Sequence, residues 1–160
     1  MQIFRKQKSP GKRRGTTIVE TAVVLPVFFT FIFGFIEFGH VFMTIHTLNS
    51  AARRAARLGV GESATTAQVE TLAHDILDSA IDADLENVRI LVKDASTFDS
   101  MSFDVSSVDY DALPDVTIED LEPRSLFIVR IQVPYSEVGI LGPRWISGVN
   151  LYGQSVMRKE

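Results

Sequence analysis

Residues 16–36 read Thr-Thr-Ile-Val-Glu-Thr-Ala-Val-Val-Leu-Pro-Val-Phe-Phe-Thr-Phe-Ile-Phe-Gly-Phe-Ile, with Glu20 as the one charged side chain. No charge follows it from Thr21 to Ile36. With the four residues before Glu20, this stretch reaches the ~20 residues that a transmembrane helix needs. We therefore predict one membrane span that contains Thr21, Pro26 and Ile36.

Charge is distributed unevenly along the 160 residues, whose net charge is −4. Residues 1–15 carry 6 basic and no acidic side chains, whereas residues 59–160 carry 18 acidic and 7 basic ones. Lys and Arg beside a span hold that end in the cytoplasm, so we expect the C-terminal part on the other side of the cytoplasmic membrane. Its acidity excludes nucleic acid as the partner of the folded part, because phosphates repel it.

A basic segment before an apolar one is also the plan of a removable secretory signal. Two features disfavour that alternative. The apolar run is longer than a usual signal core, and no small-x-small cleavage site follows before Glu37. We expect the apolar segment to remain in the mature protein.

A helical period continues past the apolar segment and predicts one helix over residues 16–58. Apolar residues recur at spacings of three and four, at Phe38, Val41, Phe42, Ile45, Leu48, Ala52, Ala55 and Ala56. A helix of this length extends about 65 Å, roughly twice a bilayer core, so half of it would form a stalk. Gly59 and Gly61 predict its end.

Residues 59–160 predict an α+β domain. Thr65 and Gln68 have the spacing of a capping box, which opens a second helix with one apolar stripe. Branched and apolar runs predict strands at 88–93, 126–133 and, more weakly, 149–158. The expected sheet is mainly antiparallel.

The acidic segment 94–122 is the least regular part of the domain. Phe98, Phe103 and Val105 are compatible with an edge strand before a loop. Asp109, Asp111 and Asp115 resemble the start of a calcium loop, but Pro114 stands where such a loop needs glycine. We expect a solvated acidic loop and no metal site.

The stretch Gly15-Thr16-Thr17-Ile18-Val19-Glu20 lies where the basic leader meets the apolar helix. A glycine leaves a flexible backbone that a protease can bind in extended form. A carboxylate in an apolar helix costs on the order of 2.5 to 3.5 kcal/mol near a bilayer centre, and less at the interface, so a cationic partner would stabilise Glu20. Alternatively, Glu20 lies at headgroup level near a helix start, where the dipole favours negative charge.

This stretch resembles the TadE-like minor pseudopilins of the tight-adherence (Flp) pilus system, a branch of the type IV pilin-like proteins. Further matches follow in order, and the set covers about residues 11–58: Lys12-Arg13-Arg14, Glu20-Thr21-Ala22-Val23-Val24-Leu25-Pro26, Phe35-Ile36-Glu37-Phe38-Gly39 and Ala51-Ala52-Arg53-Arg54-Ala55-Ala56-Arg57. Major pilins of the system tend to have an aromatic residue after the glutamate. Thr21 at that position fits a minor component better.

The resemblance implies a pilin-like fold and a maturation step. A membrane-embedded prepilin peptidase would cleave between Gly15 and Thr16 on the cytoplasmic face. Glu20 would then be fifth in the mature chain and would pair with the new α-amino group of a neighbouring subunit. Its role would be in assembly, with other pilin or pseudopilin subunits as partners.

Three other features in the helix have two interpretations each. Glu37 is either a second partner site within the membrane or the outer end of the span, where its carboxylate reaches water. Pro26 either bends the helix to suit a curved bundle or makes a harmless kink. Arg53, Arg54 and Arg57 complement the helix dipole and could pair with the acidic domain.

Residue types for catalysis are sparse. The chain has no Cys and 3 His, and His40, His46 and His74 lack the spacing of a helical zinc site. We find no phosphate-binding glycine loop and no nucleophile elbow. The sequence predicts neither an enzyme nor a cofactor.

Together these features predict three segments: a basic cytoplasmic leader at 1–15, a transmembrane and stalk helix at 16–58 and an extracytoplasmic domain at 59–160. The expected protein is a minor pseudopilin of a tight-adherence pilus, matured by a prepilin peptidase and held in the lipid bilayer. The alternative is an uncleaved single-span protein whose outer domain senses or binds a ligand.

Overall fold

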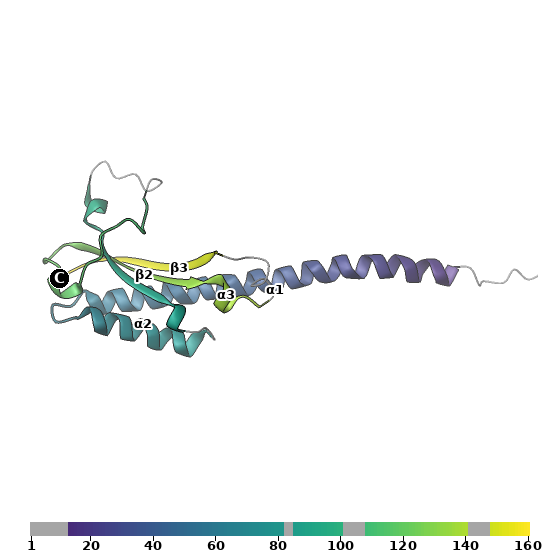
Figure 1. Cartoon of the computed structure of the whole chain (residues 1–160), viewed down its shortest axis with the longest axis horizontal. Helices are drawn as coiled ribbons and strands as arrows, with labels where there is room; N and C mark the ends of the chain where they lie inside the picture. Colours follow the sequence, from purple (N-terminus) through teal and green to yellow (C-terminus); the bar gives the residue numbers. More distant parts are fainter. Residues whose placement is uncertain (1–12, 82–84, 101–107, 141–147) are drawn as a thin grey trace, which may run out of the picture. The chain divides into compact units, whose positions relative to one another are not determined.

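A computed structural model describes residues 13–81, 85–100, 108–140 and 148–160 (Figure 1). The predicted α+β class is confirmed. The longer elements are α1 (Arg13–Gly59), α2 (Thr66–Ala80), β1 (Arg89–Asp94), β2 (Leu126–Pro134) and β3 (Asn150–Arg158). The one-turn helix α3 (Tyr135–Val138) follows β2, and short 3-10 turns cover Leu85–Asn87, Ser96–Asp99 and Ile118–Asp120.

The chain divides into two compact units, Met1–Ile36 and Glu37–Glu160, and α1 contributes to both. In the first unit the described chain is α1 alone, and most of its large apolar side chains are exposed, from 42% for Leu25 to 75% for Phe35. Among the described residues, α1 is the one helix long and apolar enough to cross a membrane, over Thr17–Gly59. The candidate span therefore lies where the sequence predicts it.

The second unit is built on a three-stranded antiparallel sheet in the order β1-β2-β3, in which Val129 of β2 pairs with Val92 of β1 and Ser155 of β3. All three predicted strands are confirmed to within one residue at each end. The central strand β2 is buried along most of its length because it has a neighbour on both edges and is covered on both faces.

Helices α1 and α2 cover one face of the sheet, as the hydrophobic core shows (Figure 1). The core side of α1 is lined by fully buried small residues, which let the sheet approach closely: Ala51, Ala52, Ala55 and Ala56. Helix α2 begins with the predicted capping box between Thr65 and Gln68. It buries Val69, Ala73 and Leu77 against the same core.

Lys159 and Glu160, about 100 residues after the end of α1, bind the backbone carbonyls at that helix end. The buried Lys159 ammonium donates hydrogen bonds to the Gly59 carbonyl at 3.3 Å and the Gly61 carbonyl at 2.7 Å. The Glu160 amide donates to the Val60 carbonyl. Because the last carbonyls of a helix have no partner within it, these bonds complete the helix end that the two glycines predict.

The expected edge strand in segment 94–122 is not found at Phe98. That residue lies in the 3-10 turn Ser96–Asp99, whereas Phe103 and Val105 lie outside the described residues. An isolated antiparallel bridge joins Lys93 to Asp115 instead. The described part of the segment lacks the regular alternation of a strand, and its backbone meets the sheet through single hydrogen bonds: the Asp94 amide donates to the Pro114 carbonyl, the Val116 amide to the Val92 carbonyl and the Ala95 amide to the Leu126 carbonyl.

Candidate functional site

Gly15 and Thr16 lie in the first turn of α1, which begins at Arg13. Gly15 is exposed, and a Cβ built on it would have no heavy atom within 4 Å. The first four amides of a helix have no carbonyl partner, so this turn is the part of α1 that unwinds most easily. Among the described residues, no side chain therefore covers the backbone at Gly15.

Glu20 lies one helical turn after Thr16, on an exposed stretch of α1. Its neighbours Ile18 and Val19 are 69% and 64% exposed, so the carboxylate stands among apolar side chains that also lack cover. Within the described part of the chain, no ion pair joins Glu20 to a cation. The carboxylate is thus available to a positive group from outside this unit.

The three residues predicted to lie in the span, Thr21, Pro26 and Ile36, follow along the same helix. The Thr21 hydroxyl donates to the Thr17 carbonyl at 2.8 Å, which satisfies a polar group inside an apolar segment. Helix α1 runs through Pro26 without interruption. The Thr30 hydroxyl donates to the Pro26 carbonyl at 2.8 Å.

Glu37, the second carboxylate of α1, has a partner that neither sequence interpretation included. The Tyr135 hydroxyl, at the start of α3, donates a hydrogen bond to Glu37 Oε1 from 98 residues further along the chain. Burial of the phenol raises the pKa of Tyr135 to about 12, and the hydrogen bond and negative charge of Glu37 add to this effect. Glu37 is therefore a half-buried acceptor held by the second unit.

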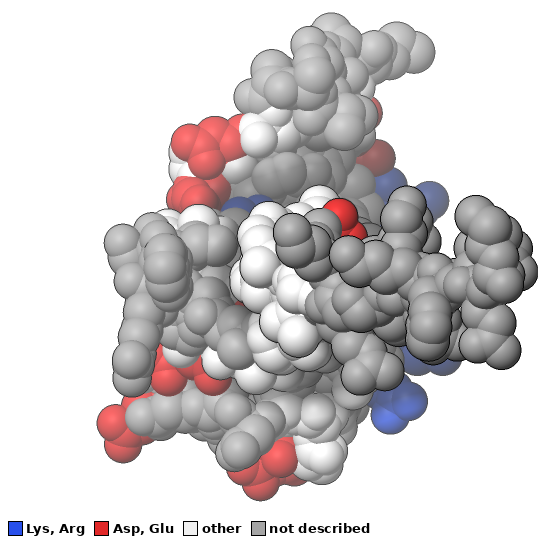
Figure 2. All heavy atoms as spheres, turned by 90° about the vertical axis from the view of Figure 1, so that its right-hand side faces the viewer, with Lys and Arg blue, Asp and Glu red and all other residues white. Residues whose placement is uncertain are grey.

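The arginines predicted to pair with the acidic domain are exposed on α1. Among the described residues, no ion pair joins Arg53, Arg54 or Arg57 to a carboxylate. They line a hollow of about 210 Å³ together with Ser50 and Met157. Figure 2 shows Lys and Arg side chains gathered on one side of the displayed face and most Asp and Glu side chains on the other.

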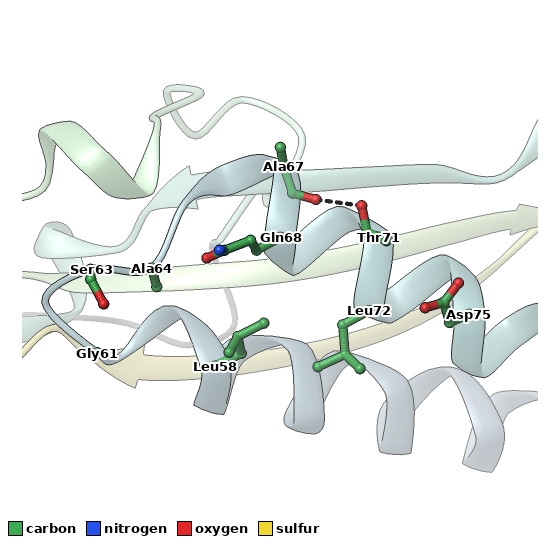
Figure 3. Close-up of a pocket in the computed structure, with 9 residues that line it drawn as sticks. All are labelled: Leu58, Gly61, Ser63, Ala64, Ala67, Gln68, Thr71, Leu72 and Asp75. Atoms are coloured by element: carbon green, nitrogen blue, oxygen red, sulfur yellow. Dashed lines mark hydrogen bonds between the residues drawn. The ribbon is translucent and has the colours of Figure 1, made fainter.

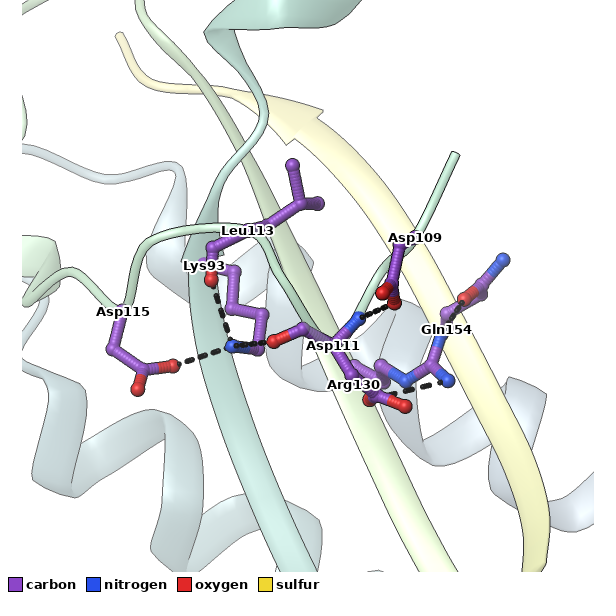
Figure 4. Close-up of polar contacts among 7 residues, drawn as sticks. All are labelled: Lys93, Asp109, Asp111, Leu113, Asp115, Arg130 and Gln154. Atoms are coloured by element: carbon purple, nitrogen blue, oxygen red, sulfur yellow. Dashed lines mark hydrogen bonds and ion pairs between the residues drawn. The ribbon is translucent and has the colours of Figure 1, made fainter. Parts of the chain in front are cut away.

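Two buried cations lie on the sheet face opposite the helices, and sequence reasoning missed both. The Lys93 ammonium donates to the Leu113 carbonyl at 2.8 Å and pairs with Asp115 at 2.9 Å (Figure 4). Arg130 donates to Gln154 at 3.1 Å and lies 3.5 Å from Asp111. The acidic loop is exposed as predicted, with the side chains of Asp115 and Asp111 74% and 59% exposed, and its aspartates and carbonyls also bind these cations.

Aromatic rings complete the surroundings of Arg130. Its guanidinium carbon lies 4.1 Å from the ring centroid of Tyr152 and 5.1 Å from that of Tyr110. Such cation–π contacts stabilise a desolvated guanidinium. We interpret this cluster as the attachment of the 109–115 loop to the sheet, because Asp115 and Asp111 of the loop pair with Lys93 and Arg130; among the described residues the buried Arg130 Nε has no hydrogen-bond partner.

A groove of about 700 Å³ lies between the end of α1 and α2 (Figure 3). Its walls are small, polar or apolar side chains, with Asp75 as the one charged residue: Leu58, Gly61, Ser63, Ala64, Ala67, Gln68, Thr71, Leu72 and Asp75. Among the described residues, no group of three or more His, Cys, Asp or Glu side chains is placed to hold a metal ion. The side chains that line the groove do not form a set of catalytic or metal-binding groups.

One comparison with known proteins gives a match, to the N-terminal part of the chain. Residues 15–57 match the family model described as TadE-like protein. The resemblance predicted from the sequence is therefore confirmed, over the same helix that carries Gly15, Glu20 and the three arginines. No curated protein and no solved structure matches the chain.

Proposed function

We propose that this chain, whose residues 15–57 match the TadE-like model, is a minor pseudopilin that takes part in assembling a tight-adherence pilus. One observation carries the proposal: an exposed Gly15 lies in the first turn of an exposed apolar helix, with Glu20 further along the same helix. The family match supports a role in the Tad pilus system. A single candidate span supports a single-pass membrane protein.

In this proposal the basic leader stays in the cytoplasm and residues 59–160 lie outside the cytoplasmic membrane. The 6 positive charges of residues 1–15 favour that orientation. Prepilin peptidase would hydrolyse the Gly15–Thr16 bond with one water molecule. The products would be a carboxylate on Gly15 and an ammonium group on Thr16.

The new ammonium group gives Glu20 its function. A carboxylate among apolar side chains is stabilised most by a positive charge in the same medium, because attraction is stronger at low dielectric constant. In an assembled pilus the cation would be the Thr16 amine of a neighbouring subunit. Only processed chains could then assemble, which links maturation to incorporation.

The surfaces of the second unit suit a binding role better than a catalytic one. The 109–115 loop binds the buried cations Lys93 and Arg130. Arg53, Arg54 and Arg57 of α1 are exposed and could bind an acidic partner. Other pilin or pseudopilin subunits are the partners we propose. We assign the chain to assembly and not to catalysis.

The test is the N-terminal sequence of the chain purified from membranes that contain the prepilin peptidase. We expect the wild type to begin at Thr16 and the Gly15→Lys variant to begin at Met1. Gly11→Lys is the matched control, since it makes the same substitution in the leader away from the cleavage site and should still be processed. A wild-type chain that begins at Met1 would reject the pseudopilin and leave the uncleaved sensor as the better function.

A further inference from the structure

Exposed apolar side chains of the second unit gather at the end where α1 enters it. We define the basal patch as Phe38, Phe42 and Met43 of α1 with Ile140 and Val149, which are 67%, 63%, 65%, 55% and 47% exposed. Elsewhere in the described part of this unit, only Leu58 and Val156 are large, apolar and exposed, each by 40%. Single exposed apolar residues are ordinary, but a gathered set marks a contact surface.

Contacts within the unit bring the members of the basal patch together. Met43 and Ile140 line the same cavity, which has a volume of about 280 Å³. The Tyr135 hydroxyl donates to Glu37 of α1. The backbone amide of the same tyrosine donates to the Val149 carbonyl at 2.8 Å. The helix and the two loop residues therefore belong to one end of the unit.

The surface of α1 changes character just after the basal patch. On the exposed side of the helix, Met43 is followed by His46 and then by Arg53, Arg54 and Arg57. The apolar part therefore ends within one turn. This matches the step from hydrocarbon to water at a bilayer boundary.

The length of the predicted span places that boundary just before the basal patch. The span of residues 16–36 has the ~20 residues that a bilayer core needs and ends at Ile36. Phe38 follows within one turn, and Phe42 and Met43 follow within about two turns. Aromatic and apolar groups are favoured at that level, where headgroups meet acyl chains.

The Glu37–Tyr135 pair explains how a carboxylate is tolerated there. Tyr135 is 5% exposed, and its hydroxyl donates to Glu37. A hydrogen-bonded carboxylate costs less to remove from water than an unpaired one. The hydrogen bond to Tyr135 therefore allows Glu37 to lie beside the exposed apolar side chains of the basal patch.

We infer that the basal patch is seated in the outer headgroup layer of the lipid bilayer, so that the second unit rests on the membrane. This inference rests on the membrane anchorage contained in the proposed function. It adds that Ile140 and Val149, far from α1 in sequence, contact lipid. The partner is the bilayer and not a neighbouring subunit.

The absence of Cys from the sequence allows a direct test with single cysteines in the full chain. Each variant is labelled with an environment-sensitive fluorophore and placed in phosphatidylcholine and phosphatidylglycerol vesicles that contain a lipid with a quencher near its headgroup. Val149→Cys has Val156→Cys as its matched control, and Ile140→Cys has Leu58→Cys. Phe28→Cys reports on the span itself and is measured in matched vesicles whose lipid carries the quencher at the end of its acyl chain, because Phe28 lies near the middle of the predicted span.

We expect the quencher to reduce emission several-fold more at residues 140 and 149 than at their controls. Equal, weak quenching at all four positions, with strong quenching at Phe28→Cys, would overturn the basal-patch inference and leave the anchor intact. Emission that changes with the ratio of protein to lipid, but not with the quencher, would assign the patch to a neighbouring subunit. Weak quenching at Phe28→Cys would overturn the span and with it both proposals.

Discussion

Gly153 of β3 lies directly against Leu48 of α1. A Cβ added at Gly153 would come within 2.3 Å of the Leu48 carbonyl carbon and 2.5 Å of its Cβ. The next residue, Gln154, donates its amide to the side-chain oxygen of Asn49 at 3.2 Å. The edge strand and the helix are thus joined by backbone contact at a position where only glycine fits.

The Gly153→Ala variant should be less stable, because the added methyl group must push β3 away from α1. Overpacking of this kind costs about 1 to 3 kcal/mol. Urea unfolding of the full chain in detergent micelles, followed by circular dichroism, measures the loss. Gly61→Ala is the control, since its nearest neighbour would be at an ordinary 3.8 Å; a similar loss in both variants would contradict the close-contact explanation.

Replacing the buried Lys159 by Met should also destabilise the second unit. The variant leaves the Gly59 and Gly61 carbonyls without their donor, and bonds to a charged group contribute about 1.5 to 3 kcal/mol. Arg158→Met is the comparison, because its ion pair with Asp99 is about half exposed and should contribute less than about 1 kcal/mol. If both variants unfold at the same urea concentration, Lys159 does not stabilise the helix end.

Stability at high pH should depend on Tyr135. The folded state raises the pKa of this phenol from 10.0 to about 12, so it binds the phenolic proton more tightly than the unfolded state does. The resulting stabilisation is complete below pH 10.0 and is lost as the pH rises towards about 12.

Comparison of the wild type with Tyr135→Phe isolates this effect, because other groups titrate equally in both. We expect the wild type to lose more stability than the variant between pH 10.0 and about 12. Parallel pH profiles of the two urea midpoints would show that Glu37 does not hold the phenol in solution.

Glu20→Gln should separate processing from assembly. The cleavage site lies upstream of the helix position that changes, so the mature chain should still begin at Thr16. Incorporation into pili should fall by more than about tenfold, because an ammonium group left without its carboxylate in an apolar medium costs about 3 kcal/mol or more. Thr21→Ser is the control, and normal piliation by Glu20→Gln would make the carboxylate a simple interface residue.

Local signals were sufficient to predict the two longer helices and the three strands, but not the 3-10 turn at Phe98. The capping box at Thr65 and the two glycines after Leu58 mark helix ends through contacts within a few residues. The three strands were predicted to within one residue because branched apolar runs and turn residues alternate along the chain. The helix start was predicted three residues too late: α1 begins at Arg13, so Gly15 lies in its first turn and not in the leader before it.

Contacts between distant residues could not be predicted in this way. Tyr135 and Glu37 are 98 residues apart, and nothing in the neighbourhood of either indicates the other. Lys93 and Arg130 were assigned to strands, but their burial depends on the acidic loop that folds over that face. Charge counting predicted the exposed loop but not its ion pairs with Lys93 and Arg130, because composition does not specify which cation a carboxylate meets.

The bond from Lys159 to Gly59 has a consequence for biosynthesis. The ribosome makes α1 first, and the ammonium group that closes its end is added 100 residues later. Until β3 and Lys159 have emerged, the alanine face of α1 and the inner side of β2 have no complete cover. The second unit therefore completes its folding only after translation has passed Lys159. A chain interrupted before β3 would leave the alanine face of α1 and the inner side of β2 exposed, and proteases recognise such uncovered surfaces.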